Sequence, residues 1–348
     1  MTQLEQIIRE IIAAQGPISM AAYMELALQH PVHGYYRVRK PVGRTGDFIT
    51  APEVSQMFGE MIGVWCAETW RLMGKPAAFA LVELGPGRGT MMRDILRATA
   101  HVGGFHAAMD LCLIESDEAL RAEQHEKLDV YAPRYCADIA QLPPLPSIIV
   151  ANEFFDALPV RQFEKSFQGW CERRVAVVDD ALTVVLHPLD DLSENFIPSD
   201  QREAFPGTII ETSAKAQHLM RELAQHLVAH KGSMLLIDYG YVASSGAATL
   251  QAVSRHAYAD IFERPGEVDL TAHVDFSALA EAARAVGGQV SSVIGQGEFL
   301  QNLGIEIRAD NLKRQSSVVQ AADIDAALHR LIDPTQMGEM FKVVEMKG

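Results

Sequence analysis

The feature that most constrains this fold is the stretch Phe79–Ala98, where an apolar run leads through alternating glycines into residues that can form a helix. The run Phe79–Leu84 has the composition of a buried strand, with Glu83 near its carboxyl end. The glycines that follow are Gly85, Gly87 and Gly89. Glycine allows a sharp turn and the close approach of a ligand. The free N–H groups of a helix over 90–98 favour a carboxylate or a phosphate. The stretch therefore predicts a nucleotide-type site in an open α/β sheet.

The spacing of these glycines distinguishes between ligands. A dinucleotide fingerprint reads G-x-G-x-x-G, with an acid about 20 residues further on. Here the spacing is G-x-G-x-G, and the next acid at a strand end is Glu115, 30 residues after Gly85. No Gly-Lys-Ser/Thr follows, so the turn is not a P-loop. The pattern resembles motif I and the acid after it in class I methyltransferases, which bind S-adenosylmethionine.

That resemblance implies a role for each residue of the pattern. The turn, with Thr90 after it, would hold the methionine part of S-adenosylmethionine, and Glu115 would take both ribose hydroxyls. Glu83 belongs to the same cofactor site. Two alternatives remain open: a strand–helix connection that binds no ligand, and an NAD-dependent oxidoreductase, which the glycine spacing disfavours.

Composition excludes several other classes. The 348 residues suggest one large or two modest domains, and 48% of them are hydrophobic, as in globular proteins. A net charge of −15 argues against a surface for nucleic acid, which needs clustered Lys and Arg. The four cysteines show no Cys-x-x-Cys pair, so neither a metal site nor a disulfide framework is expected. No apolar run reaches the ~18 residues of a membrane helix, so no membrane insertion is expected.

Strand and helix patterns alternate from Phe79 onward. Strands are expected at 79–84, 111–116, 131–136, 147–151, 233–237, 290–294 and 341–344. Helices are expected at 3–14, 19–28, 53–73, 90–98, 117–128, 214–230 and 275–285. This order predicts an α/β fold with a doubly wound, mostly parallel sheet. We expect an N-terminal helical region with a cofactor-covering loop at 1–75. A methyltransferase domain at 76–348 would then carry a β-rich insertion at about 161–210.

Ligands in such sheets bind beyond the carboxyl ends of the strands. Polar residues follow the expected strands at that edge: Glu83–Gly89, Glu115, Asp138, Asn152–Asp156 and Asp238–Gly240. Five polar clusters at strand ends are the strongest structural argument for a site there.

Five motifs, spread in order along the chain, point to one family. They are GDFITAPEVSQMFGE (46–60), ELGPGRGT (83–90), ANEFFDALPV (151–160), DYG (238–240) and DLTAHVDF (269–276). With them the chain resembles the MidA-like methyltransferases, bacterial relatives of the mitochondrial protein-arginine methyltransferase that assists complex I assembly. The resemblance implies a protein substrate, an arginine acceptor and, by extension, a respiratory-complex subunit. It also implies a bacterial, cytoplasmic protein, since the N-terminus lacks a transit or signal peptide. The oligomeric state stays open.

An arginine acceptor needs its guanidinium held, and paired carboxylates do this best because the planar fork bonds them bidentately. Glu153 and Asp156 are the candidates, and Asn152 is placed to hydrogen-bond near the methyl group. The alternative is that both acids satisfy free N–H groups at a helix N-terminus. Asp138 is placed to accept from the adenine amino group, or else it caps a helix. Asp47, in a loop over the site, is placed to contact the cofactor's amino group, or else it serves only a turn.

Two irregular stretches, 30–52 and 249–275, are candidate loops around the site. His256 and His273 in the second are candidate general bases, although a lone histidine is more often structural. The leading hypothesis is a protein methyltransferase. The alternatives are a small-molecule methyltransferase and a binding or assembly factor that keeps the fold without turnover.

Overall fold

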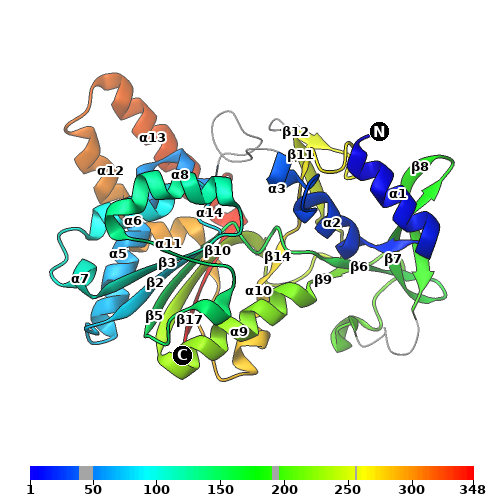
Figure 1. Cartoon of the computed structure of the whole chain (residues 1–348), viewed down its shortest axis with the longest axis horizontal. Coiled ribbons are helices and arrows are strands. Elements are labelled where there is room, and N and C mark those ends of the chain that lie inside the picture. The colour runs from blue at the N-terminus through cyan, green and yellow to red at the C-terminus, as the bar shows by residue number, and fades with distance from the viewer. Residues whose placement is uncertain (39–49, 190–195, 255–256) are drawn as a thin grey trace.

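The computed structural model describes residues 1–38, 50–189, 196–254 and 257–348. Its elements form two neighbouring parts, a large sheet covered by helices and a smaller β-rich part next to the N-terminal helices (Figure 1). The candidate site lies on the large sheet, so that sheet is described first.

The central sheet has the strand order β15-β17-β10-β5-β2-β3-β4. Its strands are β2 (Phe79–Leu84), β3 (Met109–Ile114), β4 (Arg134–Cys136), β5 (Ser147–Asn152), β10 (Gly232–Tyr241), β15 (Gln289–Val290) and β17 (Phe341–Lys347). The five strands from β10 to β4 are parallel, and β17 is antiparallel to β10. Two short strands pair at the side, β14 (Val274–Asp275) with β10 and β16 (Ile294–Gly295) with β17. The expectation of an α/β fold with a mostly parallel sheet is confirmed.

Helices cover both faces of this sheet, because its strands are apolar on both sides. One face packs against α5 (Gln56–Leu72), α6 (Thr90–Thr99), α11 (Gln296–Asn302) and α12 (Ile305–Lys313). The other packs against α9 (Ala214–His230) and α10 (Phe276–Arg284). The remaining helices of this part are α4 (Ala51–Val54), α7 (Phe105–Ala108), α8 (Glu118–Leu128), α13 (Val318–Ile332) and α14 (Met337–Met340). Helices on both faces make the sheet doubly wound.

A second core lies under the N-terminal helices α1 (Gln3–Gln15) and α2 (Met20–Gln29). They pack on a sheet built from β1 (Ile18–Ser19), β6 (Arg161–Ser166), β7 (Gly169–Val178), β8 (Ala181–Pro188) and β9 (Ile209–Thr212). A small sheet of β11 (Gln251–Ser254), β12 (Ala257–Ala259) and β13 (Asp269–Thr271) and the short helix α3 (Tyr35–Val38) lie beside them. The division into 1–75 and 76–348 stays a prediction. The structure adds that the first two helices share a core with the insertion.

The structure differs from the expected elements at several places, among them the stretch 249–275, which was expected to be irregular and contains β11, β12 and β13. The helix expected at 53–73 is broken at Ser55, whose φ of −160° is extended, and this separates α4 from α5. The strand expected at 290–294 is reduced to the short pieces β15 and β16. Two helices that the sequence analysis did not identify, α12 and α13, form the C-terminal arm seen beside α5 in Figure 1. None of the helices in the described ranges has both the length and the apolar character that crossing a membrane requires.

Candidate active site

The turn between β2 and α6 depends on glycine backbone geometry. Gly85, Gly87 and Gly89 all have a positive φ, at 60°, 51° and 72°. A Cβ at Gly85 would lie 2.6 Å from Cδ2 of Phe154, so only glycine fits there. A Cβ at Gly87 would meet no atom of the described residues within 4 Å, which leaves space between them in front of the turn. The turn therefore packs on the residues after β5 at one glycine and faces a space that a ligand can fill at the next.

Two acids predicted for the cofactor lie at the ends of neighbouring strands. Glu83 is 2% exposed, and its Oε2 has no hydrogen-bond partner within the described part of the chain. Burial raises the pKa of Glu83 to about 8, and the charge of Glu115 adds to the rise. Burial also raises the pKa of Glu115, whose Oε1 accepts the N–H of Asp117 at 2.8 Å.

Gln124 on α8, which the sequence analysis did not identify, links the glycine turn to Glu115. Its Nε2 donates to the carbonyl oxygen of Gly87 at 2.6 Å and lies 3.4 Å from Oε2 of Glu115. Gln124 is fully buried, and no described residue bonds its Oε1. Only the three-dimensional structure reveals this link, because 37 residues separate Gln124 from Gly87.

One cavity collects about half of the predicted site residues. It is lined by residues of α4, of the end of β2, of the glycine turn and of the end of β5. The predicted residues that line it are Glu83, Gly85, Gly87, Thr90, Asn152 and Glu153. Gly89, Glu115, Asp138 and Asp156 are not among the lining residues. Asp138 follows β4 and is the N-cap residue of a short 3-10 helix, Ile139–Gln141. Its side chain makes no capping hydrogen bond to that helix. Asp47 and His256 lie outside the described residues.

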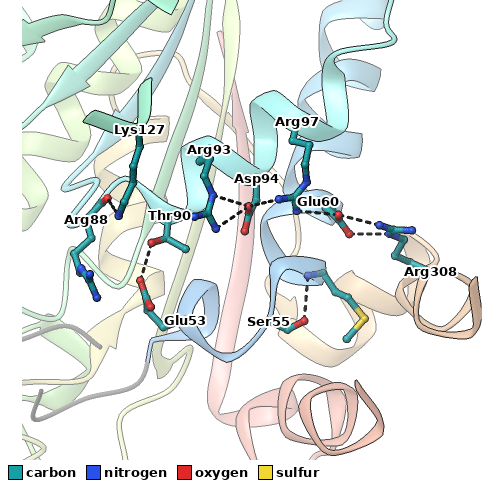
Figure 2. A network of polar contacts seen from close by, with 11 residues as sticks. Glu53, Ser55, Glu60, Arg88, Thr90, Arg93, Asp94, Arg97, Lys127 and Arg308 are labelled. Atoms are coloured by element: carbon teal, nitrogen blue, oxygen red, sulfur yellow. Dashed lines mark hydrogen bonds and ion pairs between the residues drawn. The ribbon is translucent and has the colours of Figure 1, made fainter. Parts of the chain in front are cut away.

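The short helix α4 forms one wall of this cavity. Its Glu53 accepts a hydrogen bond at Oε1 from Oγ1 of Thr90, at 2.7 Å, which ties α4 to the start of α6 (Figure 2). Pro52 lies in the first turn of α4, where proline is tolerated. Neither Glu53 nor Arg88, which also lines the cavity, was singled out from the sequence.

Glu153, which follows β5, lines the cavity next to α4 in a strained conformation. Its φ is 50°, unusual for a residue other than glycine, and its N–H donates to the carbonyl oxygen of Ile237 at 2.9 Å. Its Oε1 accepts from the N–H of Ala51 at 2.9 Å and from Nδ2 of Asn152 at 3.1 Å. Burial raises the pKa of Glu153 to about 7. Glu153 therefore does satisfy a helix N-terminus, but that of α4 and not that of a helix following β5.

Asp156 lies further along the same turn and differs in its partners. Its Oδ2 accepts from the hydroxyl of Tyr239 at 2.6 Å, whereas its Oδ1 is buried without a partner among the described residues. Burial raises the pKa of Asp156 to about 6, although the Tyr239 hydroxyl counteracts the rise. Residues 153–158 form turns and no helix, so Asp156 does not cap a helix after β5.

Asp238 holds this turn from the neighbouring strand. Its Oδ2 accepts the N–H groups of Phe154, Phe155 and Asp156 at 3.1, 2.9 and 3.3 Å. Burial, followed by the charges of Asp156 and Glu153, raises the pKa of Asp238 well above its usual value. His273 packs edge-on against the ring of Tyr239, with 5.6 Å between ring centroids.

The unpaired atoms of the site match the groups of S-adenosylmethionine. Glu83 Oε2, Gln124 Oε1 and Asn152 Oδ1 are buried acceptors that no described residue satisfies. They suit the ammonium, amino and hydroxyl donors of that cofactor, because buried polar atoms need partners. The free N–H groups at the start of α6 suit its carboxylate. The residues present therefore fit the cofactor that the sequence predicts.

The fold and the site together define a methyltransferase that depends on S-adenosylmethionine. A family model described as "Putative S-adenosyl-L-methionine-dependent methyltransferase" matches residues 61–294, which is more than half of the chain. The chain belongs to this family.

Individual relatives agree with this assignment. The chain is 35% identical over 363 residues to the mitochondrial protein arginine methyltransferase NDUFAF7 of Xenopus tropicalis, covering 95% of this chain and 82% of the relative. It is 36% identical over 366 residues to the Homo sapiens protein of that name, covering 95% and 80%.

A solved structure agrees as well. A COG1565 superfamily member from Burkholderia thailandensis, crystallised with S-adenosyl-homocysteine, is 28% identical, with a TM-score of 0.83 over 99% of this chain and 92% of that one. S-adenosylmethionine is the cofactor of this chain.

Proposed function

We propose that this chain transfers the methyl group of S-adenosylmethionine to a side-chain nitrogen of arginine in a protein. The observation that carries the proposal is Asp156, a carboxylate only 7% exposed whose Oδ1 lacks a partner among the described residues. A buried carboxylate oxygen without a partner is costly, and a guanidinium N–H would satisfy it. The names of the relatives, which are protein arginine methyltransferases, support the same acceptor.

In this proposal the residues after β5 hold the acceptor. Asp156 would bond the guanidinium through Oδ1, and Glu153, which lines the cofactor cavity, would supply the second carboxylate. Two carboxylates suit the planar fork of arginine and oppose its rotation. Such positioning is the main contribution an enzyme makes to a displacement reaction, worth ~7–11 kcal/mol in well-oriented cases. The bound cofactor supplies an electrophilic methyl group.

The acceptor nitrogen must also lose a proton when it is methylated. The pKa of Glu153 is raised to about 7 and that of Asp156 to about 6, in both cases mainly by burial. Carboxylates with pKa values near neutrality are suited to accept a proton at the working pH. Asn152 donates to Glu153 Oε1 and keeps its own Oδ1 for a donor in the cavity.

The cofactor side of the proposal uses the remaining predicted residues. Gly85, Gly87, Gly89 and Thr90 would receive the methionine part at the start of α6, with Glu83 beneath it. Glu115 would accept from the ribose hydroxyls and Asp138 from the adenine amino group, since Glu115 follows β3, which lies beside β2, and Asp138 follows β4, the next strand of the sheet. Asp47 stays a candidate for the cofactor's amino group.

The substrate and compartment follow as part of the same proposal. A subunit of a respiratory complex is the proposed protein substrate, on the resemblance to the MidA-like family. The cytoplasm of a bacterium is the proposed location, and the four cysteines fit a reducing compartment because all are free and buried.

The test is transfer of a labelled methyl group. Purified protein is incubated with S-adenosylmethionine carrying a tritiated methyl group and with lysate proteins, and the labelled protein is hydrolysed to amino acids. We expect label in methylarginine, and we expect Asp156→Asn to remove it while retaining binding of S-adenosyl-homocysteine. Label in another amino acid or in a small molecule would contradict the arginine acceptor. Cofactor binding without any transfer would favour an assembly factor.

A further inference from the structure

We propose that Tyr239 is a positioning residue that fixes the carboxylate of Asp156, so that Oδ1 alone is presented to the acceptor guanidinium. The inference rests on the proposed function and assigns a role to the Asp-Tyr-Gly motif at the end of β10. It follows from three contacts that hold Asp156 by its N–H, its carbonyl oxygen and one carboxylate oxygen.

The first two contacts fix the backbone of Asp156. Asp238 accepts its N–H at 3.3 Å together with the N–H groups of the two residues before it. On the other side, the N–H of Ala272 donates to the carbonyl oxygen of Asp156 at 3.0 Å. The Cα of Asp156 is therefore held between β10 and the segment that follows β13.

The third contact fixes the side chain. The Tyr239 hydroxyl donates to Oδ2 of Asp156 at 2.6 Å, and this leaves Oδ1 as the buried oxygen without a partner in the described ranges. Burial and the charges of Asp156 and Asp238 raise the pKa of Tyr239 well above its usual value, so its hydroxyl keeps the proton it donates. The carboxylate cannot rotate without breaking a short, charge-assisted hydrogen bond.

The ring of Tyr239 is held in turn by its neighbours. It lies edge-on to His273, at 5.6 Å and 83°, and to Phe341, at 5.4 Å and 72°. Phe341 opens β17, the strand beside β10. Two adjacent residues of β10 thus have complementary roles. Asp238 holds the turn that carries Asp156, and Tyr239 orients the side chain of Asp156.

The experiment measures binding of ethylguanidinium, a mimic of the arginine tip, to the full chain saturated with S-adenosyl-homocysteine. Tyr239→Phe removes the hydroxyl and keeps the ring. The matched control is Tyr241→Phe, two residues further along the same strand, where no hydrogen bond to Asp156 is made by the described atoms. We expect Tyr239→Phe to weaken ethylguanidinium binding about tenfold, with the affinity for S-adenosyl-homocysteine unchanged. We expect the control variant to match the unmodified protein in both.

A pH profile separates positioning from general loosening. The Tyr239 hydroxyl stabilises the ionised form of Asp156, so its removal should move the midpoint of ethylguanidinium binding to higher pH. The other titratable groups around Asp156 and Tyr239 stay the same in both proteins: Tyr36, Glu153, Asp238, Asp269 and His273. The difference between the two midpoints therefore measures the effect of the Tyr239 hydroxyl on the ionisation of Asp156.

Equal affinity and an equal midpoint in Tyr239→Phe would overturn the inference while leaving arginine methylation intact. Absence of ethylguanidinium binding to the unmodified protein would overturn both the inference and the assignment of Asp156. The methylarginine assay tells these cases apart, because it tests the acceptor without reference to Tyr239.

Discussion

The carboxylate of Glu153 caps a helix that begins 102 residues earlier in the chain, where its Oε1 accepts the N–H of Ala51 at 2.9 Å. Thr50, the N-cap residue of α4, makes no side-chain capping bond, and Glu153, the residue after β5, accepts the N–H of Ala51 instead. On the other side of α4, Glu53 accepts from Thr90. The wall of the cofactor cavity is thereby fastened both to the glycine turn and to the acceptor turn.

Because Glu153 is one of the two residues that hold α4 in place, two substitutions of Glu153 should give different results. Glu153→Ala removes the acceptor for Ala51 N–H and should destabilise the fold by about 1 kcal/mol, the usual cost of losing a cap. Glu153→Gln keeps an oxygen at that place and should unfold close to the unmodified protein in urea. If the charge of Glu153 also helps to hold the acceptor, Glu153→Gln loses methyl transfer despite its stability. Full activity in Glu153→Gln would leave only the structural role.

Burial of Glu83 predicts how stability depends on pH without cofactor. Its pKa is raised to about 8 in the folded chain, first by burial and then by Glu115, against about 4.3 in an unfolded chain. Between these values the folded state binds more protons, so the free energy of unfolding should fall as pH rises. In Glu83→Gln the side chain at this position is neutral at every pH. The free energy of unfolding of this variant should therefore fall less steeply between about pH 5 and 8.

Urea unfolding of both proteins across that range measures the difference. Some slope should remain in Glu83→Gln, because the pKa values of Glu153 and Asp156 are raised in the same direction, to about 7 and about 6. If the free energy of unfolding fell equally steeply with pH in the unmodified protein and in Glu83→Gln, Glu83 would not titrate between about pH 5 and 8.

The sequence predicts best the elements that local patterns determine. The apolar run of β2 and the helix Ala214–His230 have the predicted bounds. The helix expected at 275–285 also begins where predicted, because Asp275 is the N-cap residue of α10 and accepts the N–H of Ala278 at 3.0 Å. Capping residues and uninterrupted apolar runs are local signals, which single-sequence reasoning can use.

The contacts that the sequence could not supply are long-range. The break at Ser55 was missed because the apolar pattern continues through it, although Ser55 is itself a good N-cap and accepts from Met57 N–H. The link from Gln124 to Gly87 and the one from Tyr239 to Asp156 join segments far apart in the chain. Strand ends placed the candidate residues on one edge of the sheet, but the partners of each acid required the folded structure.

An ion-pair network predicts how the C-terminal arm is attached. Glu60 on α5 is 5% exposed and accepts from Arg97 of α6 at 3.0 Å and from Arg308 of α12 at 2.7 Å (Figure 2). Glu60→Ala removes bonds to two arginines and should destabilise the chain by about 2 kcal/mol, because hydrogen bonds between charged groups are worth more than neutral ones. Urea unfolding measures the loss.

The control for the network is Glu68→Ala on the same helix. Glu68 pairs with Arg71 one turn away, and both side chains are at least half exposed. Such surface pairs contribute little, so no measurable change is expected. Equal behaviour of the two variants would show that the network does not hold α12 to α5.

The glycine turn offers the sharpest separation of folding from cofactor binding. Among the described residues, alanine at Gly87 meets no atom within 4 Å and adds the backbone strain of a φ of 51°, about 1–2 kcal/mol. Its methyl group would project into the space left for the cofactor. Gly87→Ala should therefore lose most affinity for S-adenosylmethionine with a modest fall in melting temperature.

Alanine at Gly85 would clash with the protein itself, because its Cβ would lie 2.6 Å from the Phe154 ring. Gly85→Ala should lower the melting temperature more than Gly87→Ala, since it adds a steric clash inside the protein to a comparable backbone strain. Calorimetric titration with S-adenosylmethionine and thermal unfolding of both variants measure the two effects. A Gly87→Ala variant that binds the cofactor normally would contradict the placement of the cofactor against this turn, whereas equal melting temperatures would show that the Phe154 ring moves aside.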